Sequence, residues 1–145
     1  MDSKVGRAVN EVIDAMVERR SCRSFKAEMP SEEQLDAVVE AGLYAASGMG
    51  RQSAIILKVT DHALRDRLSA LNAQVMGAPE GTDPFYGAPA VLVVLAARDV
   101  PTHVYDGSLA MGNMLLAADS LGLGSIWIHR AKEEFEEPEY QQLLK

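Results

Sequence analysis

Apolar residues recur at helical spacing in two stretches near the start of the chain. The first stretch predicts an amphipathic helix that ends near Arg19 and Arg20. Its apolar positions are Val5, Ala8, Val9, Val12, Ile13, Met16 and Val17. A second helix is predicted to begin after Ser31, because Ser31 and Gln34 fit a capping box in which each side chain satisfies the other residue's backbone N–H. Apolar residues over positions 35–46 mark the buried face of this helix.

Short apolar runs predict three strands. Residues 54–59 form a bounded run of strand-forming residues, and residues 90–96 are apolar on both faces. The second run is therefore expected at the centre of a sheet that helices cover on each side. Residues 106–121 predict a helix that begins at Asp106 and is apolar nearly all round, with small residues that favour a homodimer interface. A short strand is expected after it, at residues 125–128.

The rest of the chain predicts one further helix, a long loop and a short terminal helix. Asp61 is placed to cap a helix, and Pro138 to start one near the end of the chain. Residues 77–89 are rich in turn formers and lack a period, which predicts a loop. This loop carries Phe85 and Tyr86, so it either covers a ligand or simply connects two elements.

Size and charge limit the kinds of partner that the chain can have. A length of 145 residues with 48% hydrophobic content predicts one domain with a sizeable core. The net charge of −7 argues against nucleic acid and against an anionic membrane surface. No apolar run approaches the ~18 residues of a membrane span, and a lone cysteine, Cys22, fits a reducing compartment. A soluble cytoplasmic protein is expected.

One basic stretch stands out in this acidic chain. Residues 19–26 hold four of the 14 lysines and arginines, interleaved with serines. Guanidinium and hydroxyl groups both donate hydrogen bonds to phosphate oxygens, so a phosphorylated small ligand is one interpretation. The other is that Arg19 and Arg20 interact with the negative end of the preceding helix, with no ligand required. The helix end does not account for Arg23, which lies beyond it.

Other catalytic chemistry finds little support in the sequence. His62, His103 and His129 stand singly, without the spacing of metal ligands, so no metal is expected. No G-x-S-x-G elbow is present, and hydrolysis is not indicated. The glycine pair at Gly48 and Gly50 follows a helix and precedes a strand, the reverse of the order in a dinucleotide-binding turn. A basic patch and a glycine-rich polar loop remain, consistent with a phosphorylated ring cofactor.

Several stretches together resemble the nitroreductase family of FMN-dependent oxidoreductases. They are residues 19–25, 45–52, 86–89 and 106–128. The resemblance implies an α+β fold, a three-layer α/β/α sandwich whose central mixed sheet is flanked by helices. It also implies an interlocked homodimer with FMN across the interface, and a single FMN-binding domain over residues 1–145. Family members continue into a C-terminal arm, which this sequence is expected to lack.

The resemblance also implies an activity and a set of cofactor contacts. NADH or NADPH would reduce FMN, which would then reduce a nitroaromatic, quinone or similar small aromatic acceptor in a ping-pong mechanism. FMN would carry the redox chemistry, so no catalytic side chain is expected. The contacts fall into three groups: the phosphate and ribityl end with Arg19, Arg20, Ser21 and Arg23; the pyrimidine edge with Arg51 and Gln52; and the N5 side with Ile128, His129 and Arg130.

Two alternatives stay open, of which only the first comes from another class of protein. One is a flavin-binding or flavin-handling module with little turnover. The other is a family member with a specialised reaction, such as reductive removal of a halogen or flavin fragmentation. Gly50 stands where the family often has Asn, and Ser53 and Ala54 replace a frequent Pro-Trp pair.

Overall fold

The computed structural model describes residues 10–145, which form six α-helices, two strands and two 3-10 turns. The helices are α1 (Glu11–Glu18), α2 (Glu32–Leu43), α3 (His62–Met76), α4 (His103–Ser120), α5 (Ala131–Glu134) and α6 (Pro138–Gln141). The strands are β1 (Ala54–Val59) and β2 (Val91–Ala96), and the turns are η1 (Gly48–Gly50) and η2 (Gln142–Leu144). Val5, Ala8 and Val9 of the first predicted helix lie outside the described residues.

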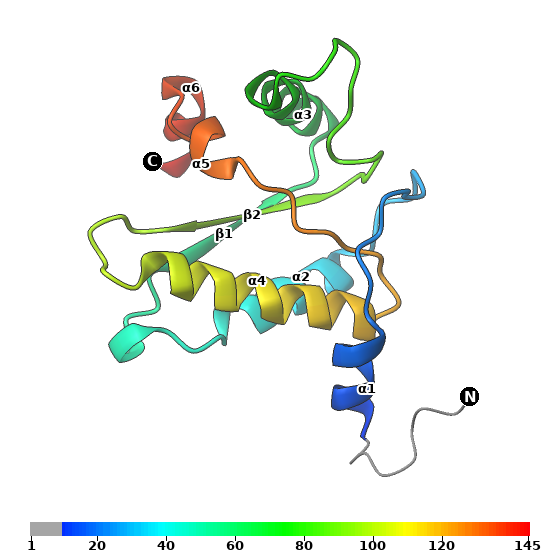
Figure 1. The fold of residues 1–145 in the computed structure, drawn as a ribbon, viewed down its shortest axis with the longest axis vertical. Helices are drawn as coiled ribbons and strands as arrows, with labels where there is room; N and C mark the ends of the chain where they lie inside the picture. The colour runs from blue at the N-terminus through cyan, green and yellow to red at the C-terminus, as the bar shows by residue number, and fades with distance from the viewer. Residues whose placement is uncertain (1–9) are drawn as a thin grey trace.

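The two strands form an antiparallel pair with helices on both faces. Ala54 lies opposite Ala96, and Val59 lies opposite Val91. Helices α2 and α4 lie on one side of the pair, and α3, α5 and α6 lie on the other (Figure 1). Within residues 10–145, β2 pairs with β1 alone, so the expectation that it forms the centre of a larger sheet is wrong for this chain by itself.

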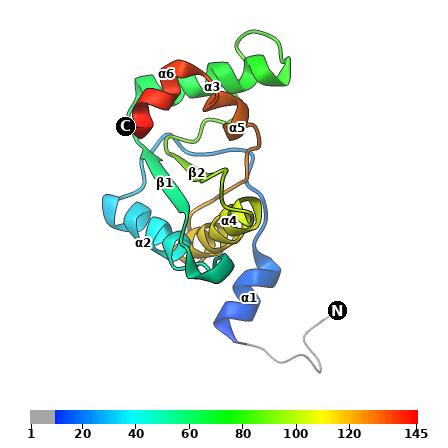
Figure 2. The same ribbon diagram turned by 90° about the vertical axis from the view of Figure 1, so that its left-hand side faces the viewer.

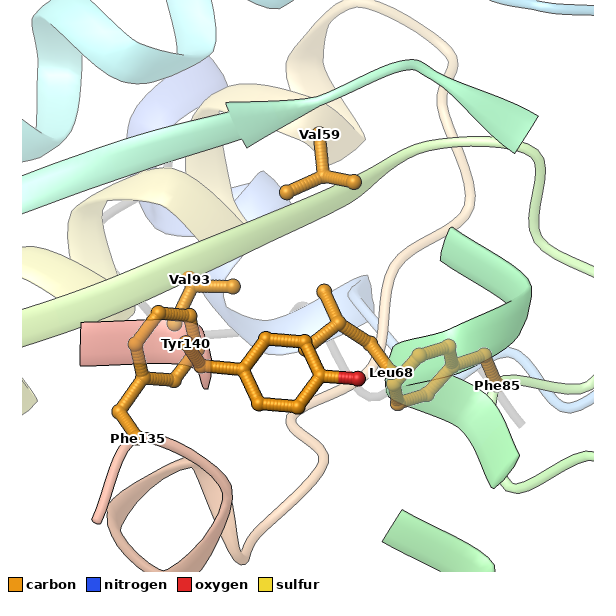
Figure 3. Packing of buried hydrophobic residues seen from close by; sticks show 6 residues of the cluster. All are labelled: Val59, Leu68, Phe85, Val93, Phe135 and Tyr140. Atoms are coloured by element: carbon orange, nitrogen blue, oxygen red, sulfur yellow. The ribbon is translucent and has the colours of Figure 1, made fainter. Parts of the chain in front are cut away.

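Each face of the strand pair has its own hydrophobic core. On one face, Val38 of α2 packs with Met114 and Ala118 of α4. On the other face, the buried cluster joins both strands to α3, the long loop, α5 and α6 (Figure 3). Its members are Val59, Leu68, Phe85, Val93, Phe135 and Tyr140. Helices thus pack on both faces of the strand pair, as Figure 2 also shows, and the apolar run of β2 predicted this cover on each side.

Helix ends follow the local sequence where a side chain caps its own helix. Ser31 Oγ accepts from the Gln34 N–H at 3.2 Å, and Gln34 Oε1 accepts from the Ser31 N–H at 3.0 Å, which confirms the capping box. Asp61 Oδ1 likewise accepts from the Leu64 N–H at 2.8 Å. These contacts satisfy N–H groups that have no partner within the helix.

The predicted start of the fourth helix is wrong by three residues. Helix α4 begins at His103, and Asp106 lies inside it, buried. The Asp106 carboxylate accepts from the Gly48 N–H at 2.9 Å and from Thr102 Oγ1 at 2.8 Å. Asp106 therefore ties the loop at η1 to the first turn of α4, a tertiary role that local helix signals do not reveal.

Residues 125–128 do not form the expected strand. Ser125 makes only an isolated parallel bridge with Ser21, through a 3.0 Å hydrogen bond from the Cys22 N–H to the Ser125 carbonyl oxygen. Gly124 packs so close to this bridge that an added Cβ would lie 3.0 Å from Cys22 Sγ. The segment thus runs extended beside the basic stretch.

The long loop at residues 77–89 is held firmly against α3 by Asp83. The Asp83 carboxylate accepts from Arg65 at 2.6 Å, from Ser69 Oγ at 2.6 Å, and from the N–H groups of Phe85 and Gly87 at 3.0 and 2.8 Å. Phe85 is buried in the core. The Phe85 ring therefore stabilises the fold, while its neighbour Tyr86 is exposed.

Helix α4 is buried on one side only. Its buried residues Ala110, Met114 and Ala118 face the core, whereas Val104 and Tyr105 are 62% and 71% exposed. The expectation of a helix buried nearly all round is wrong for the single chain. Across residues 10–145, no helix has both the length and the apolar character needed to cross a membrane.

Candidate functional site

The basic stretch lies where α1 ends and the chain becomes extended. Arg20 Nη1 donates to the carbonyl oxygens of Val17 and Arg19, at 2.7 and 2.8 Å, so it satisfies acceptors at the end of the helix. The helix-end interpretation therefore accounts for the position of Arg20. Arg23 lies beyond the helix with its side chain exposed.

Two polar side-chain atoms, one in this stretch and one beside it, are buried without a hydrogen-bond partner among the described residues. Within residues 10–145, neither Arg19 Nη1 nor Ser125 Oγ makes a hydrogen bond. A buried donor left unpaired costs about 1–3 kcal/mol, and more when it is charged. Ser125 bridges to Ser21 in the basic stretch, so both atoms belong to one region. Guanidinium and hydroxyl donors are the groups that bind a phosphate, and here they have no competing partner.

A second polar loop surrounds η1 and carries Arg51 and Gln52. Its backbone has positive φ at Met49 (56°), Gly50 (65°) and Gln52 (49°), a conformation that non-glycine residues adopt only when their surroundings hold it. The Gln52 N–H donates to Ser47 Oγ at 2.9 Å, and Gln52 Nε2 donates to the Ala45 carbonyl oxygen at 3.3 Å. The Gln52 side chain thus stabilises the loop and leaves Arg51 exposed.

The basic stretch and the η1 loop lie at opposite ends of α4. The Gly48 N–H contacts Asp106 in the first turns of α4, whereas Ser21 bridges to Ser125, beyond the last turn. Helix α4 has 18 residues and so spans about 27 Å. Figure 1 shows the same separation, with η1 near one end of α4 and the segment after α1 near the other. One chain therefore does not bring Arg19 and Arg51 together.

The third predicted group, Ile128 to Arg130, lies between the strand pair and α5. Ile128 packs against the core that contains Phe135, while His129 is exposed. Arg130 has a φ of 84° and precedes the first turn of α5. This left-handed backbone conformation is unfavourable for a non-glycine residue, so Arg130 needs support from outside its own segment.

Asn72 of α3 supplies that support. It is fully buried, its Nδ2 donates to the His129 carbonyl oxygen at 3.1 Å, and its Oδ1 accepts from Arg130 Nε at 2.9 Å. Sequence reasoning did not identify Asn72. Its only signal is a polar side chain four positions after Leu68, on the apolar face of a helix.

Glu134 is a second residue that sequence reasoning missed. It is buried at the end of α5, and burial raises its pKa to about 7, although the Asn72 amide and the Arg130 charge act to lower that pKa. Within the described chain, Glu134 Oε1 has no hydrogen-bond partner. A carboxyl in this state is partly protonated at neutral pH. Glu134 lies among exposed acidic residues in the sequence, so its charge alone does not distinguish it from its neighbours.

A cleft of about 1190 Å³ joins the basic stretch to the third group. Its lining includes Cys22, Phe25, Met111, Ile128, Arg130 and Glu134. The predicted phosphate and pyrimidine contacts do not line it: Arg19, Arg20, Ser21, Arg23, Arg51 and Gln52 all lie outside its lining. Within residues 10–145, no cluster of three His, Cys, Asp or Glu side chains could hold a metal ion.

Comparison with known proteins identifies the family. The model of the nitroreductase family matches residues 16–144. The chain belongs to the nitroreductase family. Among solved structures, this nitroreductase-family chain is similar to a nitroreductase from Bacteroides fragilis with bound FMN, with 29% identity and a TM-score of 0.82. That comparison covers 94% of this chain and 79% of the other, which shows a nitroreductase-like fold.

Two further comparisons are consistent with membership of the nitroreductase family. A nitroreductase with bound FMN from Desulfitobacterium hafniense is 34% identical, with a TM-score of 0.73, over 79% of this chain and 68% of the other. An FMN reductase [NAD(P)H] from Bacillus subtilis is 26% identical over 141 residues. That match covers 81% of this chain but 53% of the relative, so the chain spans about half the length of this curated protein.

Proposed function

We propose that this chain is a flavoprotein that binds FMN and catalyses electron transfer from NADH or NADPH to a small acceptor, such as a nitroaromatic or a quinone. One observation carries the proposal: two polar loops suited to the two ends of FMN lie at opposite ends of α4, about 27 Å apart. A single FMN cannot reach both loops of one chain. In an interlocked homodimer whose two α4 helices run antiparallel, the basic stretch of one copy would lie beside the η1 loop of the other.

The phosphate and ribityl end of FMN is assigned to Arg19, Arg20, Ser21 and Arg23. The assignment is supported by Arg19 Nη1 and by Ser125 Oγ, both buried without a partner among the described residues. Arg23 is exposed and free of the helix end. Arg20 contributes less, because its Nη1 already donates to two backbone carbonyls. A phosphate would satisfy the orphaned donors in this region.

The pyrimidine edge is assigned to Arg51 and Gln52 of the second copy. Their loop is held by Asp106 and Ser47 on either side of Arg51, whose side chain is exposed. A cation near this edge stabilises the negative charge that reduction adds to the ring. Ile128, His129 and Arg130 are assigned to the N5 side, where Asn72 fixes the backbone.

The homodimer is supported by exposed apolar side chains on α4 and near η1. They are Leu43, Tyr44, Met49, Val104, Tyr105 and Leu109. Patches of this kind mark protein interfaces. In the dimer, residues 1–145 would act as a single FMN-binding domain with helices layered on both sides of the sheet.

FMN supplies the redox chemistry when bound, and the chain binds and orients it. The donor and the acceptor would then use the same face of the ring in turn, which is a ping-pong mechanism. No side chain is assigned a catalytic role. The lone thiol of Cys22 fits a cytoplasmic location.

An absorption spectrum of the purified protein, with and without added FMN, tests this function. The proposal predicts bound flavin, and bleaching of its visible band when NADH or NADPH is added without oxygen. Bound flavin that neither nucleotide bleaches would indicate a flavin-handling module. A protein that takes up no FMN would contradict the proposal altogether.

A further inference from the structure

Three polar residues, Asn72, Arg130 and Glu134, lie close together beside His129. Asn72 comes from α3, Arg130 precedes α5, and Glu134 ends α5 one helical turn later, where its N–H donates to the Arg130 carbonyl oxygen at 3.1 Å. Asn72 joins the group by contacting both His129 and Arg130. The segment assigned to the N5 side of FMN is thus directly linked to a buried carboxyl.

The carboxyl of Glu134 has few groups that could compensate its charge. Arg130 is the cation beside it, while Glu133 of α5 adds a like charge and Asn72 of α3 a polar contact. From α6, Tyr140 has a pKa that is raised mainly by burial, and it is near enough for the Glu134 charge to raise that pKa as well. Strand β2, which also packs against α5, contributes only apolar side chains. Within the described chain, Oε1 of Glu134 remains unpaired, so the ionised form is poorly stabilised.

This environment places the titration of Glu134 in the physiological range. Burial raises its pKa to about 7, which means that both protonation states are populated at neutral pH. Any negative charge added to the cleft raises that pKa further, because Glu134 and Arg130 both line the cleft. An anion that attracts Arg130 also removes part of the compensation for the carboxylate.

We propose that Glu134 takes up a proton from solvent when FMN bound beside His129 and Arg130 is reduced. This inference rests on the proposed function, because it needs FMN beside His129 and Arg130. Hydride from NADH or NADPH adds two electrons and negative charge to the ring. The Glu134 carboxylate binds a solvent proton and becomes a neutral acid, so one negative charge is removed from the same cleft. Asn72 positions Glu134 and the His129 backbone relative to each other.

The proposal predicts how the reduction potential of bound FMN depends on pH. At pH 6, Glu134 is already protonated and has no effect. Above pH 8 it is ionised before reduction and opposes the added charge. Suppose that reduction raises the pKa of Glu134 by about one unit. The preference of the protein for reduced over oxidised FMN is then up to about tenfold weaker when Glu134 is ionised than when it is protonated. For a two-electron couple, tenfold corresponds to about 30 mV.

The test compares the midpoint potential of bound FMN from pH 6 to pH 8.5 in three proteins. They are the wild type, Glu134→Gln and the control Glu137→Gln, whose exposed side chain lies just after the same helix. Glu134→Gln should match the wild type at pH 6 and lie about 30 mV higher at pH 8.5. Glu137→Gln should follow the wild type, because solvent screens its charge. FMN's own protonation contributes equally to all three.

Two outcomes separate the inference from the function on which it rests. If FMN binds and is reduced but the three potentials run in parallel, Glu134 takes up no proton and the inference fails alone. If none of the proteins binds FMN, both the proposed function and the inference fail.

A second measurement needs only the wild type, in case Glu134→Gln does not fold. Infrared difference spectra between reduced and oxidised protein, recorded at pH 7.5, should show a growing band of a protonated carboxyl group. The band should shift when the protein is labelled with ¹³C-glutamate. Absence of a glutamate band in the difference spectrum would overturn the inference.

Discussion

Arg130 Nε donates a 2.9 Å hydrogen bond to Oδ1 of the fully buried Asn72, 58 residues away along the chain. The same amide holds the His129 carbonyl oxygen. Two consecutive residues of an otherwise weakly paired segment are thereby fixed to α3. The backbone that is assigned to the N5 side of FMN therefore depends on a side chain outside that segment.

We expect Asn72→Ala to lower the free energy of unfolding by about 1–3 kcal/mol, because it leaves buried hydrogen-bonding groups unpaired. FMN affinity should fall as well, since the left-handed Arg130 loses its support. Urea unfolding and fluorescence titration with FMN measure the two effects. Asn113→Ala is the control, because Asn113 also donates to a distant carbonyl oxygen, that of Ala41, but is exposed. Equal losses in the two variants would contradict the role of Asn72.

Arg23 tests the phosphate assignment. Arg23→Ala should weaken FMN binding roughly 10- to 100-fold, the value of one or two charge-assisted hydrogen bonds at about 1.5–3 kcal/mol. Its unfolding midpoint should stay near that of the wild type, because the side chain is exposed. Arg67→Ala removes another exposed arginine, paired with Glu139, and should leave FMN affinity unchanged. Equal loss of folding stability and FMN affinity in Arg23→Ala would contradict the assignment.

Asp83 makes the long loop sensitive to acid. Its hydrogen bonds from Arg65, Ser69 and two backbone N–H groups outweigh the effect of burial and lower its pKa from 3.8 to about 2. A lowered folded pKa adds stability that is complete above about pH 4 and is lost as the pH falls towards 2.

Asp83→Asn should therefore be less stable than the wild type by about 1–2 kcal/mol at pH 6, after allowance for solvent screening of a partly exposed group. The difference should shrink between pH 4 and pH 2. Chemical unfolding at several pH values measures it. Asp66→Asn, which removes the more exposed partner of Arg65, should have a much smaller effect. A difference that is independent of pH would show that the charge of Asp83 is not responsible.

Glu134 has a pKa that is shifted in the opposite direction to that of Asp83. Its pKa is raised from 4.5 to about 7, so its contribution to stability is complete below about pH 4.5 and is lost as the pH rises through 7. Glu134→Gln should match the wild type at pH 4.5 and be more stable by up to about 3 kcal/mol at pH 8, since 1.36 kcal/mol corresponds to one pKa unit. Unfolding of the FMN-free proteins across this range measures the difference. A variant less stable than the wild type at pH 8 would contradict the unfavourable burial of the charge.

Local signals in the sequence predicted the elements that local contacts stabilise. The capping box at Ser31 and the cap at Asp61 involve residues three apart, and both are present. The run that became β1 was recognised as a short bounded run of strand-forming residues, and the run that became β2 because it is apolar on both faces. Family membership was also predicted, because its motifs are spread along the chain in a fixed order.

What the sequence did not reveal depends on contacts between distant segments. Asp106 has the sequence of a helix start, but its carboxylate contacts Gly48, 58 residues away. Residues 125–128 have strand-forming side chains, yet a strand also needs a partner, and only Ser125 finds one, in Ser21. Asn72 and Glu134 read as ordinary helix residues until the fold buries both. The assignments of Arg19, Arg51 and the other cofactor contacts stay predictions.

The central claim, that FMN is bound by loops of two different copies, is tested most directly by pairing two defective chains. Arg23→Ala and Arg51→Ala would each remove one end of every site in a homodimer. A heterodimer of the two variants, co-expressed with different tags and purified through both, has one site with both changes and one intact site. This heterodimer should bind one FMN per two chains with wild-type affinity, while each variant alone should bind FMN weakly. If the heterodimer binds FMN no better than either homodimer, the two loops do not share a site between copies, and the account is wrong.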